Sequence, residues 1–402
     1  MTLGILYHMP FWQTADGAIY DAEGSLARYV DSLAPYFDEI SLCVPVFDRP
    51  PADGTRVGAA NVRLEPLPYF PGPRQFYPML PFIHSRLRRW VDGCDVIHLR
   101  VPTPAAIFAF KRAQARRLPI FLLVVGDYRA LLPYLPYRGL KKWLFAAYVA
   151  FEERALTYMT RRALTFVNGG ALRAKHERDG GRVFETKTTT LQDSDINVRP
   201  DTFQTRPVRL LTVSRIDPRK GLRVLPAAVA GLVAAGVDAT IDIVGPPIGL
   251  IGEEEQRAIA SEAAREQVGD RVRFHGAVPL DRLMTMYREY DVFVLPTGPG
   301  EGIPRVLLEA MANGLPIVTT DVSGIGSLIV NGQNGVLLER ASAEAIADAV
   351  QTLSQTPALR QRLIRHGYET ARAHTVERQA AAMMTVAARE LALPLRQRPR
   401  VA

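Results

Sequence analysis

VSRIDPRKGL, residues 213–222, is the stretch that decides the fold. The apolar run before it is typical of a buried strand that ends at Ser214, and Gly221 marks a sharp turn before a helical pattern over residues 222–235. A strand, a short loop and a helix in this order predict one repeat of a parallel α/β sheet.

The same alternation continues after this stretch. Further helical patterns cover residues 253–267, 280–290 and 304–313, and the strand-like runs between them are ATIDIVG, RVRFHGAV, DVFVLPT and LPIVTTDV. Glycines fall at the expected turns and helix ends, where a positive φ costs least: Gly221, Gly236, Gly245 and Gly314. The pattern predicts a doubly wound domain over residues 206–375.

The first half repeats the pattern less regularly. Its strand-like runs are LGILYH, EISLCVPV, DVIHLRV, IFLLVVGD and the start of RALTFVNGGALRAKH. A chain of 402 residues is too long for one ordinary core. We expect a first domain over residues 1–196, a polar linker after it, and a closing amphipathic helix over residues 376–393. Ligands of such sheets bind at the carboxyl ends of the strands, so a cleft between two facing domains is the expected site.

Charge is distributed unevenly along the chain. The net charge is +8, and residues 1–200 carry 26 Lys and Arg against 19 Asp and Glu, whereas the remainder carries 23 against 22. A basic first half favours an anionic partner, and a solvated basic face is the alternative. No helix-turn-helix or zinc-finger spacing points to nucleic acid. Cys43 and Cys94 provide no disulfide framework and no thiolate zinc site, so we expect a cytoplasmic protein.

Two loops carry the candidate chemistry. Arg215 and Lys220 flank a strand-to-helix loop, where two cations would clamp a diphosphate, although solvated side chains are the alternative. In GPGEGIPRVLLEAMANGLPIV, residues 298–318, Pro304 is expected to be the first helical residue. Glu301 at the preceding loop could reach a sugar hydroxyl or cap the helix, and Glu309 could bind a ribose or lie on the surface.

These loops, followed by SGIGSLIVNGQNGVLL at residues 323–338, resemble the retaining GT-B glycosyltransferases of family 4, the glycosyl transferases group 1, over residues 205–370. The resemblance implies two Rossmann-like domains facing a central cleft, with the nucleotide sugar in the second domain and the acceptor in the first. It also implies a last helix that returns to the first domain, and no metal or other cofactor.

By the same resemblance, Arg215 and Lys220 bind the diphosphate, Glu301 the donor sugar and Glu309 the ribose. The other expected donor contacts are Gly24, Gly302, Ile303, Arg305, Val306 and, around the base, Gly276, Ala277 and Val278. For the turn at Gly24, a plain helix cap is the alternative. The family's His-Gly pair is replaced here by Gly126-Asp127, so we expect Asp127 to act at the reacting carbon or to cap its own loop.

The sequence therefore predicts a metal-independent hexosyltransferase that retains configuration and transfers a sugar from a nucleoside diphosphate to a hydroxyl acceptor. By resemblance the acceptor is a lipid-linked or surface-polysaccharide intermediate. The alternatives are a non-catalytic nucleotide-sugar-binding subunit, which the departure at Asp127 favours, and a GT-B nucleotide-sugar epimerase.

Three segments of the first half are rich in Lys and Arg, namely RLRRW (86–90), KRAQARR (111–117) and RGLKKWLF (138–145). A fourth, LPYFPGPRQFYPMLPF (67–82), is rich in proline and aromatic residues. Cations beside Trp and Phe suit an anionic membrane surface, such as the inner face of the plasma membrane. Ordinary core aromatics under a solvated basic face are the alternative.

Overall fold

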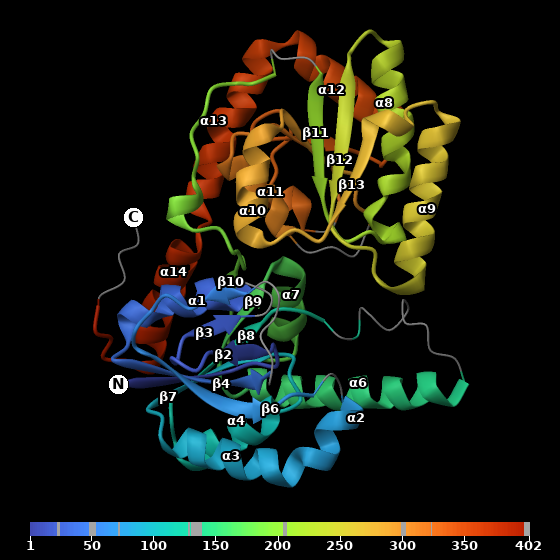
Figure 1. Cartoon of the computed structure of the whole chain (residues 1–402). Coiled ribbons are helices and arrows are strands. Elements are labelled where there is room, and N and C mark those ends of the chain that lie inside the picture. The colour runs from blue at the N-terminus through green and yellow to red at the C-terminus, as the bar shows by residue number, and fades with distance from the viewer. Residues whose placement is uncertain are drawn as a thin grey trace. The chain divides into compact units, whose positions relative to one another are not determined.

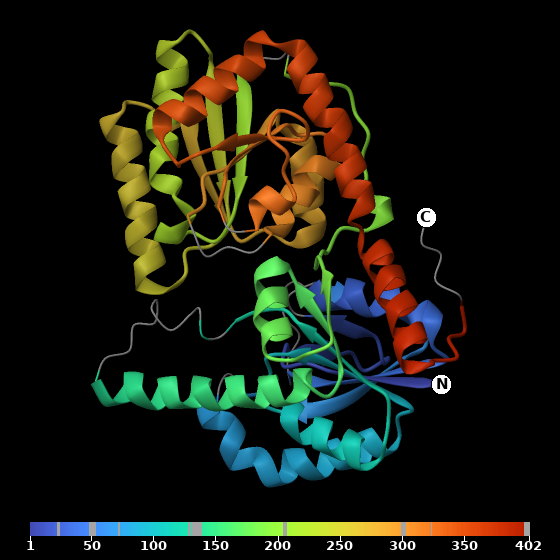
Figure 2. The ribbon, with the colours of Figure 1, turned by 180° about the vertical axis from the view of Figure 1, so that it is seen from behind.

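The computed structural model describes residues 1–21, 25–47, 54–70, 73–127, 129, 139–203, 207–298, 303–322 and 324–397. The chain forms two compact units, unit 1 (Met1–Thr190 with Val376–Ala402) and unit 2 (Leu191–Thr375). Each unit holds its own sheet with helices on both faces (Figures 1 and 2). The predicted α/β fold with two parallel-sheet domains is therefore confirmed.

The strands of unit 2 are β11 (Val208–Val213), β12 (Ala239–Val244), β13 (Val272–Gly276), β14 (Val292–Leu295), β15 (Ile317–Thr320) and β16 (Val336–Leu338). Its α-helices are α8 (Leu225–Ala234), α9 (Gly249–Arg265), α10 (Leu280–Met286), α11 (Arg305–Ala312), α12 (Ala343–Gln355) and α13 (Pro357–Ala373).

The sheet of unit 2 is parallel, in the order β13-β12-β11-β14-β15-β16. Numbered from its own first strand, this order is 3-2-1-4-5-6, as in dinucleotide-binding folds. Helices α8, α9 and α12 cover one face and α10 and α11 the other (Figure 1). The order reverses between β11 and β14, and ligands of such sheets bind at this switch point, beyond the carboxyl ends of the strands.

The strands of unit 1 are β1 (Thr2–Leu6), β2 (Phe11–Gln13), β3 (Ile19–Asp21), β4 (Glu39–Val46), β5 (Thr55–Arg56), β6 (Val62–Pro68), β7 (Val96–Val101), β8 (Ile120–Val124), β9 (Leu164–Asn168) and β10 (Val183–Thr186). Its α-helices are α1 (Ser25–Leu33), α2 (Pro73–Phe76), α3 (Leu80–Asp92), α4 (Ala106–Ala115), α6 (Gly139–Thr160), α7 (Gly170–Arg178) and α14 (Val376–Leu391).

The parallel part of this sheet runs β6-β4-β1-β7-β8-β9-β10 and also reverses once, between β1 and β7. The sheet departs from the parallel prediction at one edge, where β2, β3 and β5 add antiparallel pairs. These strands are two or three residues long, too short for a hydrophobic period to reveal them.

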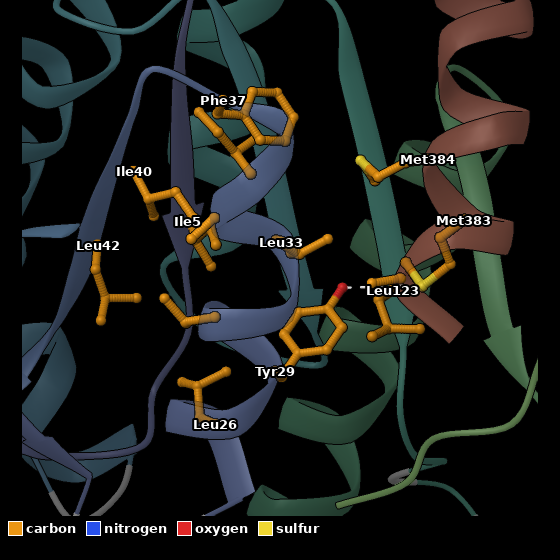
Figure 3. Close-up of a cluster of buried hydrophobic side chains, with 14 of the residues drawn as sticks. Ile5, Leu26, Tyr29, Leu33, Phe37, Ile40, Leu42, Leu123, Met383 and Met384 are labelled. Atoms are coloured by element: carbon orange, nitrogen blue, oxygen red, sulfur yellow. Dashed lines mark hydrogen bonds between the residues drawn. The ribbon is translucent and has the colours of Figure 1, made fainter. Parts of the chain in front are cut away.

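Helix α14, from the C-terminal part of the chain, belongs to unit 1. Its Met383 and Met384 are buried in one cluster with Leu33 of α1 and Leu123 of β8 (Figure 3). The hydroxyl of Tyr29 on α1 lies 3.9 Å from the Met383 sulfur. Helices α3, α4 and α6 cover the opposite face of the sheet. None of the described helices is both long enough and apolar enough to cross a membrane.

Candidate active site

At the switch point of unit 2, the loops that follow β11 and β14 are joined to each other. The Gly298 amide donates to the Arg219 carbonyl at 2.7 Å. Gly221 has φ +66°, and a Cβ there would lie 2.1 Å from the Pro296 carbonyl oxygen. Only glycine fits such a position, because a side chain would collide with the backbone of the other loop. Two segments about 80 residues apart in the sequence thus meet at one edge of the sheet.

The loop after β11 holds the predicted clamp cations in different environments. Arg215 is exposed, whereas Lys220 is only 9% exposed and ends the short 3₁₀ helix Pro218–Lys220. Asp217 caps this helix by accepting the Arg219 amide and also pairs with the Arg219 guanidinium at 2.6 Å, which lowers the pKa of Asp217. The cap and the left-handed Gly221 fix the backbone on both sides of Lys220.

Backbone packing leaves little freedom at the neighbouring strand ends. Gly245, directly after β12, has φ +135°, and a Cβ there would lie 2.0 Å from the Ser214 carbonyl oxygen. Its amide donates to the Gly276 carbonyl at 2.8 Å. Gly276 has φ +67°, and the next residues, Ala277 and Val278, are exposed and half-buried. The loop predicted to line a base pocket therefore lies at the same edge, beside the loops after β11 and β12.

The loop after β14 leads into α11, and Glu301 and Gly302 lie outside the described residues. Pro304 is not the first helical residue as predicted: its ψ of 123° is extended, and α11 begins at Arg305. The Pro304 carbonyl still accepts the Leu307 amide at 3.1 Å, as a cap residue does. Ile303 and Val306 are half-buried and Arg305 is exposed.

Glu309, one turn further along α11, is 5% exposed, so the surface alternative for it is wrong. Its Oε2 accepts the hydroxyl of Tyr287 at 3.0 Å. Burial, together with this carboxylate, raises the pKa of Tyr287 well above its ordinary value, so the hydroxyl stays protonated and donates. Sequence reasoning missed Tyr287, because 22 residues separate it from Glu309 and no local pattern relates them.

Of the site residues predicted in unit 1, Gly24 lies outside the described residues. Asp127 is described and lies shortly after β8. The Asp127 carboxylate accepts the Arg129 amide at 2.8 Å, as a loop-capping aspartate does, and pairs with Lys175 of α7 at 3.0 Å. Lys175 also pairs with Glu153 at 2.6 Å, and these two carboxylates raise its pKa against the effect of burial. A Cβ at Gly126 would meet no described atom within 4 Å, so packing does not require glycine there.

Three histidines lie in strands or shortly after one, and their surroundings differ. His98 lies inside β7 and is fully buried, stacked on Phe121 and hydrogen-bonded to the Tyr29 hydroxyl at 2.9 Å. His275 pairs with Asp242 at 3.0 Å. His8 follows β1 and its Nδ1 has no partner among the described residues. In the part of the chain that the structure describes, no three His, Cys, Asp or Glu side chains are grouped as a metal site requires.

Residues 193–370 match the family model described as glycosyl transferases group 1. Phosphatidyl-myo-inositol mannosyltransferase of Mycobacterium leprae is 28% identical over 331 residues, 76% of this chain and 77% of its own length. The putative colanic acid biosynthesis glycosyltransferase WcaL of Salmonella typhimurium is 34% identical over 154 residues, 37% of this chain. The chain spans only 36% of that relative's length.

Two solved structures share the fold over nearly the whole length of this chain. The Anabaena protein HepE in complex with UDP has a TM-score of 0.67 at 16% identity and covers 97% of this chain and 99% of its own. WaaG, a glycosyltransferase of lipopolysaccharide biosynthesis, has a TM-score of 0.66 at 15% identity, with 96% and 99% covered. At such identities the likeness shows the fold. Residues 193–370 thus form a glycosyl transferases group 1 domain, within a chain that has the GT-B fold of glycosyltransferases.

Proposed function

We propose that the protein is a retaining, metal-independent hexosyltransferase that moves a sugar from a nucleoside diphosphate to a hydroxyl acceptor. The observation that carries the proposal is the junction of two loops at the switch point of unit 2. One loop supplies Lys220 and Arg215, and the other leads to the first turn of α11. A cation pair and a helix N-terminus at one sheet edge suit a diphosphate.

In this proposal the donor's sugar–phosphate bond breaks while negative charge builds on the departing diphosphate. Lys220, Arg215 and the amides of Arg305 and Val306 stabilise that charge, which is the largest contribution expected from the protein. The acceptor hydroxyl attacks from the face that the diphosphate leaves, and a phosphate oxygen takes its proton. Glu301 and Gly302 would hold the donor sugar, Glu309 the ribose, residues 276–278 the base, and Gly24 the phosphates.

We further propose that Asp127 acts through Lys175. The ion pair with Lys175 at 3.0 Å already compensates the charge of the Asp127 carboxylate. A role in orienting the acceptor therefore fits better than direct charge stabilisation at the reacting carbon. The same ion pair favours the second candidate function, a non-catalytic nucleotide-sugar-binding subunit, because it occupies the side chain that replaces the family's histidine.

Donor binding and turnover separate these two functions. We expect UDP, GDP or ADP at about 100 times its dissociation constant to raise the unfolding free energy by about 2.7 kcal/mol, measured as a shift in melting temperature. With the cognate sugar nucleotide, an enzyme should also release the nucleoside diphosphate slowly without acceptor. Binding without release in any donor tested would favour the binding subunit, and no response to any nucleotide would contradict both functions.

The acceptor side of the proposal is a lipid-linked intermediate reached at an anionic membrane surface. The N-terminal part of α6 extends beyond the sheet of unit 1 in both views (Figures 1 and 2). Leu140, Trp143 and Leu144 are 72%, 66% and 54% exposed there, next to exposed Lys141 and Lys142. Exposed apolar side chains beside lysines suit an interface of this kind.

The segment at residues 86–90 does not contribute in the same way, because its tryptophan is a core residue. Trp90 is 5% exposed, packs in the hydrophobic cluster under α3, and donates its indole N–H to the Ser41 hydroxyl at 3.1 Å. The proposed membrane contact therefore concentrates on α6.

Flotation with vesicles containing anionic lipid tests this contact. We expect the wild-type chain to float with such vesicles and to be released by high salt, since each lysine near the surface contributes about 1 kcal/mol. Trp143→Glu with Leu144→Glu should abolish flotation. The matched control is Leu250→Glu with Ile251→Glu, which changes two side chains 75% and 54% exposed on α9 of unit 2 and should float normally. Equal flotation of both double variants would contradict a contact through α6.

A further inference from the structure

The switch point of unit 1 gathers polar side chains that the proposed transfer does not use. Strands β1 and β7 pair in parallel with Leu6 opposite Leu99, so Tyr7 and His8 lie beside Arg100 at the carboxyl ends. His98 and Arg100 alternate with Leu99, and His98 contacts Tyr29 of α1. Arg100 therefore lies on the face of the sheet that α1 covers, one step nearer the carboxyl edge.

Arg100 is a buried cation without an ion pair among the described residues. It is 9% exposed, and its guanidinium lies over the rings of Tyr7 and Tyr29, with the central carbon 4.9 Å and 4.8 Å from the ring centroids. Its Nε and Nη1 atoms are buried and have no hydrogen-bond partner in the described structure. The rings hold the guanidinium plane in one orientation, and both Nε and Nη1 are left without an acceptor.

The other buried arginines show how this chain satisfies such a group. Arg360, 3% exposed and also stacked on an aromatic ring, donates to Asp201 at 2.9 Å and to the Ser354 carbonyl at 3.2 Å. Arg28, 7% exposed, donates to the Thr190 carbonyl at 2.9 Å. A buried charge left without partners is costly, so its retention at Arg100 indicates an acceptor group that binding supplies.

Two neighbours of Arg100 also have unused polar atoms. Thr103, three residues further on, is 3% exposed, and its hydroxyl has no partner among the described residues. The Nδ1 of His8 is likewise buried and unpartnered. Burial, and secondly the charge of Arg100, lower the pKa of His8 to about 4, so the imidazole is neutral at pH 7 and adds no second positive charge. This end of the sheet therefore offers one fixed cation together with neutral hydrogen-bonding groups from His8 and Thr103.

We infer that Arg100, with Thr103 and His8, binds an oxyanion carried by the acceptor, a phosphate ester or a carboxylate. The assignment of this anion to the acceptor rests on the proposed function, in which the donor's diphosphate binds to unit 2. Both anions carry several acceptor oxygens, which suit the planar set of N–H donors of an arginine better than the point charge of a lysine. The acceptor would then be a sugar phosphate, a lipid phosphate or a uronic acid rather than a neutral sugar.

Titration of inorganic phosphate and of D-glucuronate against the chain saturated with UDP tests the site. We expect one of the two anions to raise the melting temperature of the wild type, and its identity distinguishes a phosphate acceptor from a carboxylate acceptor. In Arg100→Met the apparent dissociation constant should rise at least about tenfold, and in Arg100→Lys by an intermediate factor. The control is Arg88→Met, which removes an exposed cation of α3 and should bind the anion as the wild type does.

The melting temperature without ligand separates a binding role from a structural one. Because methionine replaces an unpaired buried charge, Arg100→Met should melt at the same temperature as the wild type or above it. A lower melting temperature with unchanged anion binding would overturn the inference, as would wild-type chain that responds to neither anion. Weaker UDP binding in Arg100→Met would also overturn it, by assigning the arginine to the donor. If UDP fails to bind but the Arg100-dependent anion response remains, the proposed function fails and the oxyanion site stands.

Discussion

Replacing Lys220 by methionine is expected to reduce kcat by about 100- to 1,000-fold, the usual effect of removing one preorganised group that stabilises transition-state charge. Lys220 is 9% exposed and its backbone is fixed between the Asp217 cap and Gly221, so the origin of the side chain is set before the donor arrives. Methionine keeps the apolar stem and avoids the cavity that alanine would leave in this buried position.

The matched control is Arg219→Gln, which removes a cation from the same loop. The Arg219 guanidinium pairs with Asp217 at 2.6 Å, so its charge is already compensated and kcat should fall only a few-fold. Steady-state rates with the cognate sugar nucleotide, and melting temperatures for both variants, provide the measurement. Near-wild-type turnover in Lys220→Met would show that the diphosphate is bound elsewhere, and equal losses in both variants would indicate a general effect of the loop.

Strands β11 to β15 of unit 2 could be predicted because buried parallel strands read as uninterrupted apolar runs, whereas β16, α12 and α13 were not predicted. The four glycines expected at turns, Gly221, Gly236, Gly245 and Gly314, all have positive φ. Their positions are local features, since a left-handed residue or a close backbone approach leaves a mark at one place in the sequence. The beginning of α9 was less accessible, because the helix starts at Gly249, four residues before the acidic run that indicated it.

Contacts between distant segments could not be predicted in this way. Lys175 donates a hydrogen bond to Asp127, 48 residues away in the sequence, and Tyr287 donates one to Glu309, 22 residues away. Neither spacing indicates a contact. The burial of Trp90 could not be predicted from its neighbours in the sequence either. Its basic neighbours indicated a surface, but the side chain at 5% exposure packs into the core, because the helical period places it on the inner face of α3. Burial of a single side chain depends on which face the fold covers.

Glu309→Gln tests the second part of the donor site, the contact with the ribose. A carboxylate can accept both vicinal hydroxyls, and each hydrogen bond to a charged group is worth about 1.5–3 kcal/mol. The glutamine has nearly the same volume, and its carbonyl oxygen can still accept the Tyr287 hydroxyl, which lies 3.0 Å from Oε2 in the native chain. We therefore expect the dissociation constant of the nucleoside diphosphate to rise at least about tenfold, with little change in melting temperature.

Tyr287→Phe is expected to have the opposite effect: it should lower stability and leave nucleotide binding nearly unchanged. Removing the hydroxyl takes a hydrogen bond from a carboxylate that is 5% exposed, which should cost about 1–3 kcal/mol of unfolding free energy. The charge of Glu309 remains in this variant, so the affinity for the nucleoside diphosphate should stay within a few-fold of the wild type. Calorimetric titration and thermal unfolding of the two variants measure both quantities. If Glu309→Gln binds the nucleotide as tightly as the wild type and loses stability instead, Glu309 serves to anchor α11 to the 3₁₀ helix Tyr287–Glu289 that follows α10, and the ribose must be recognised by another group.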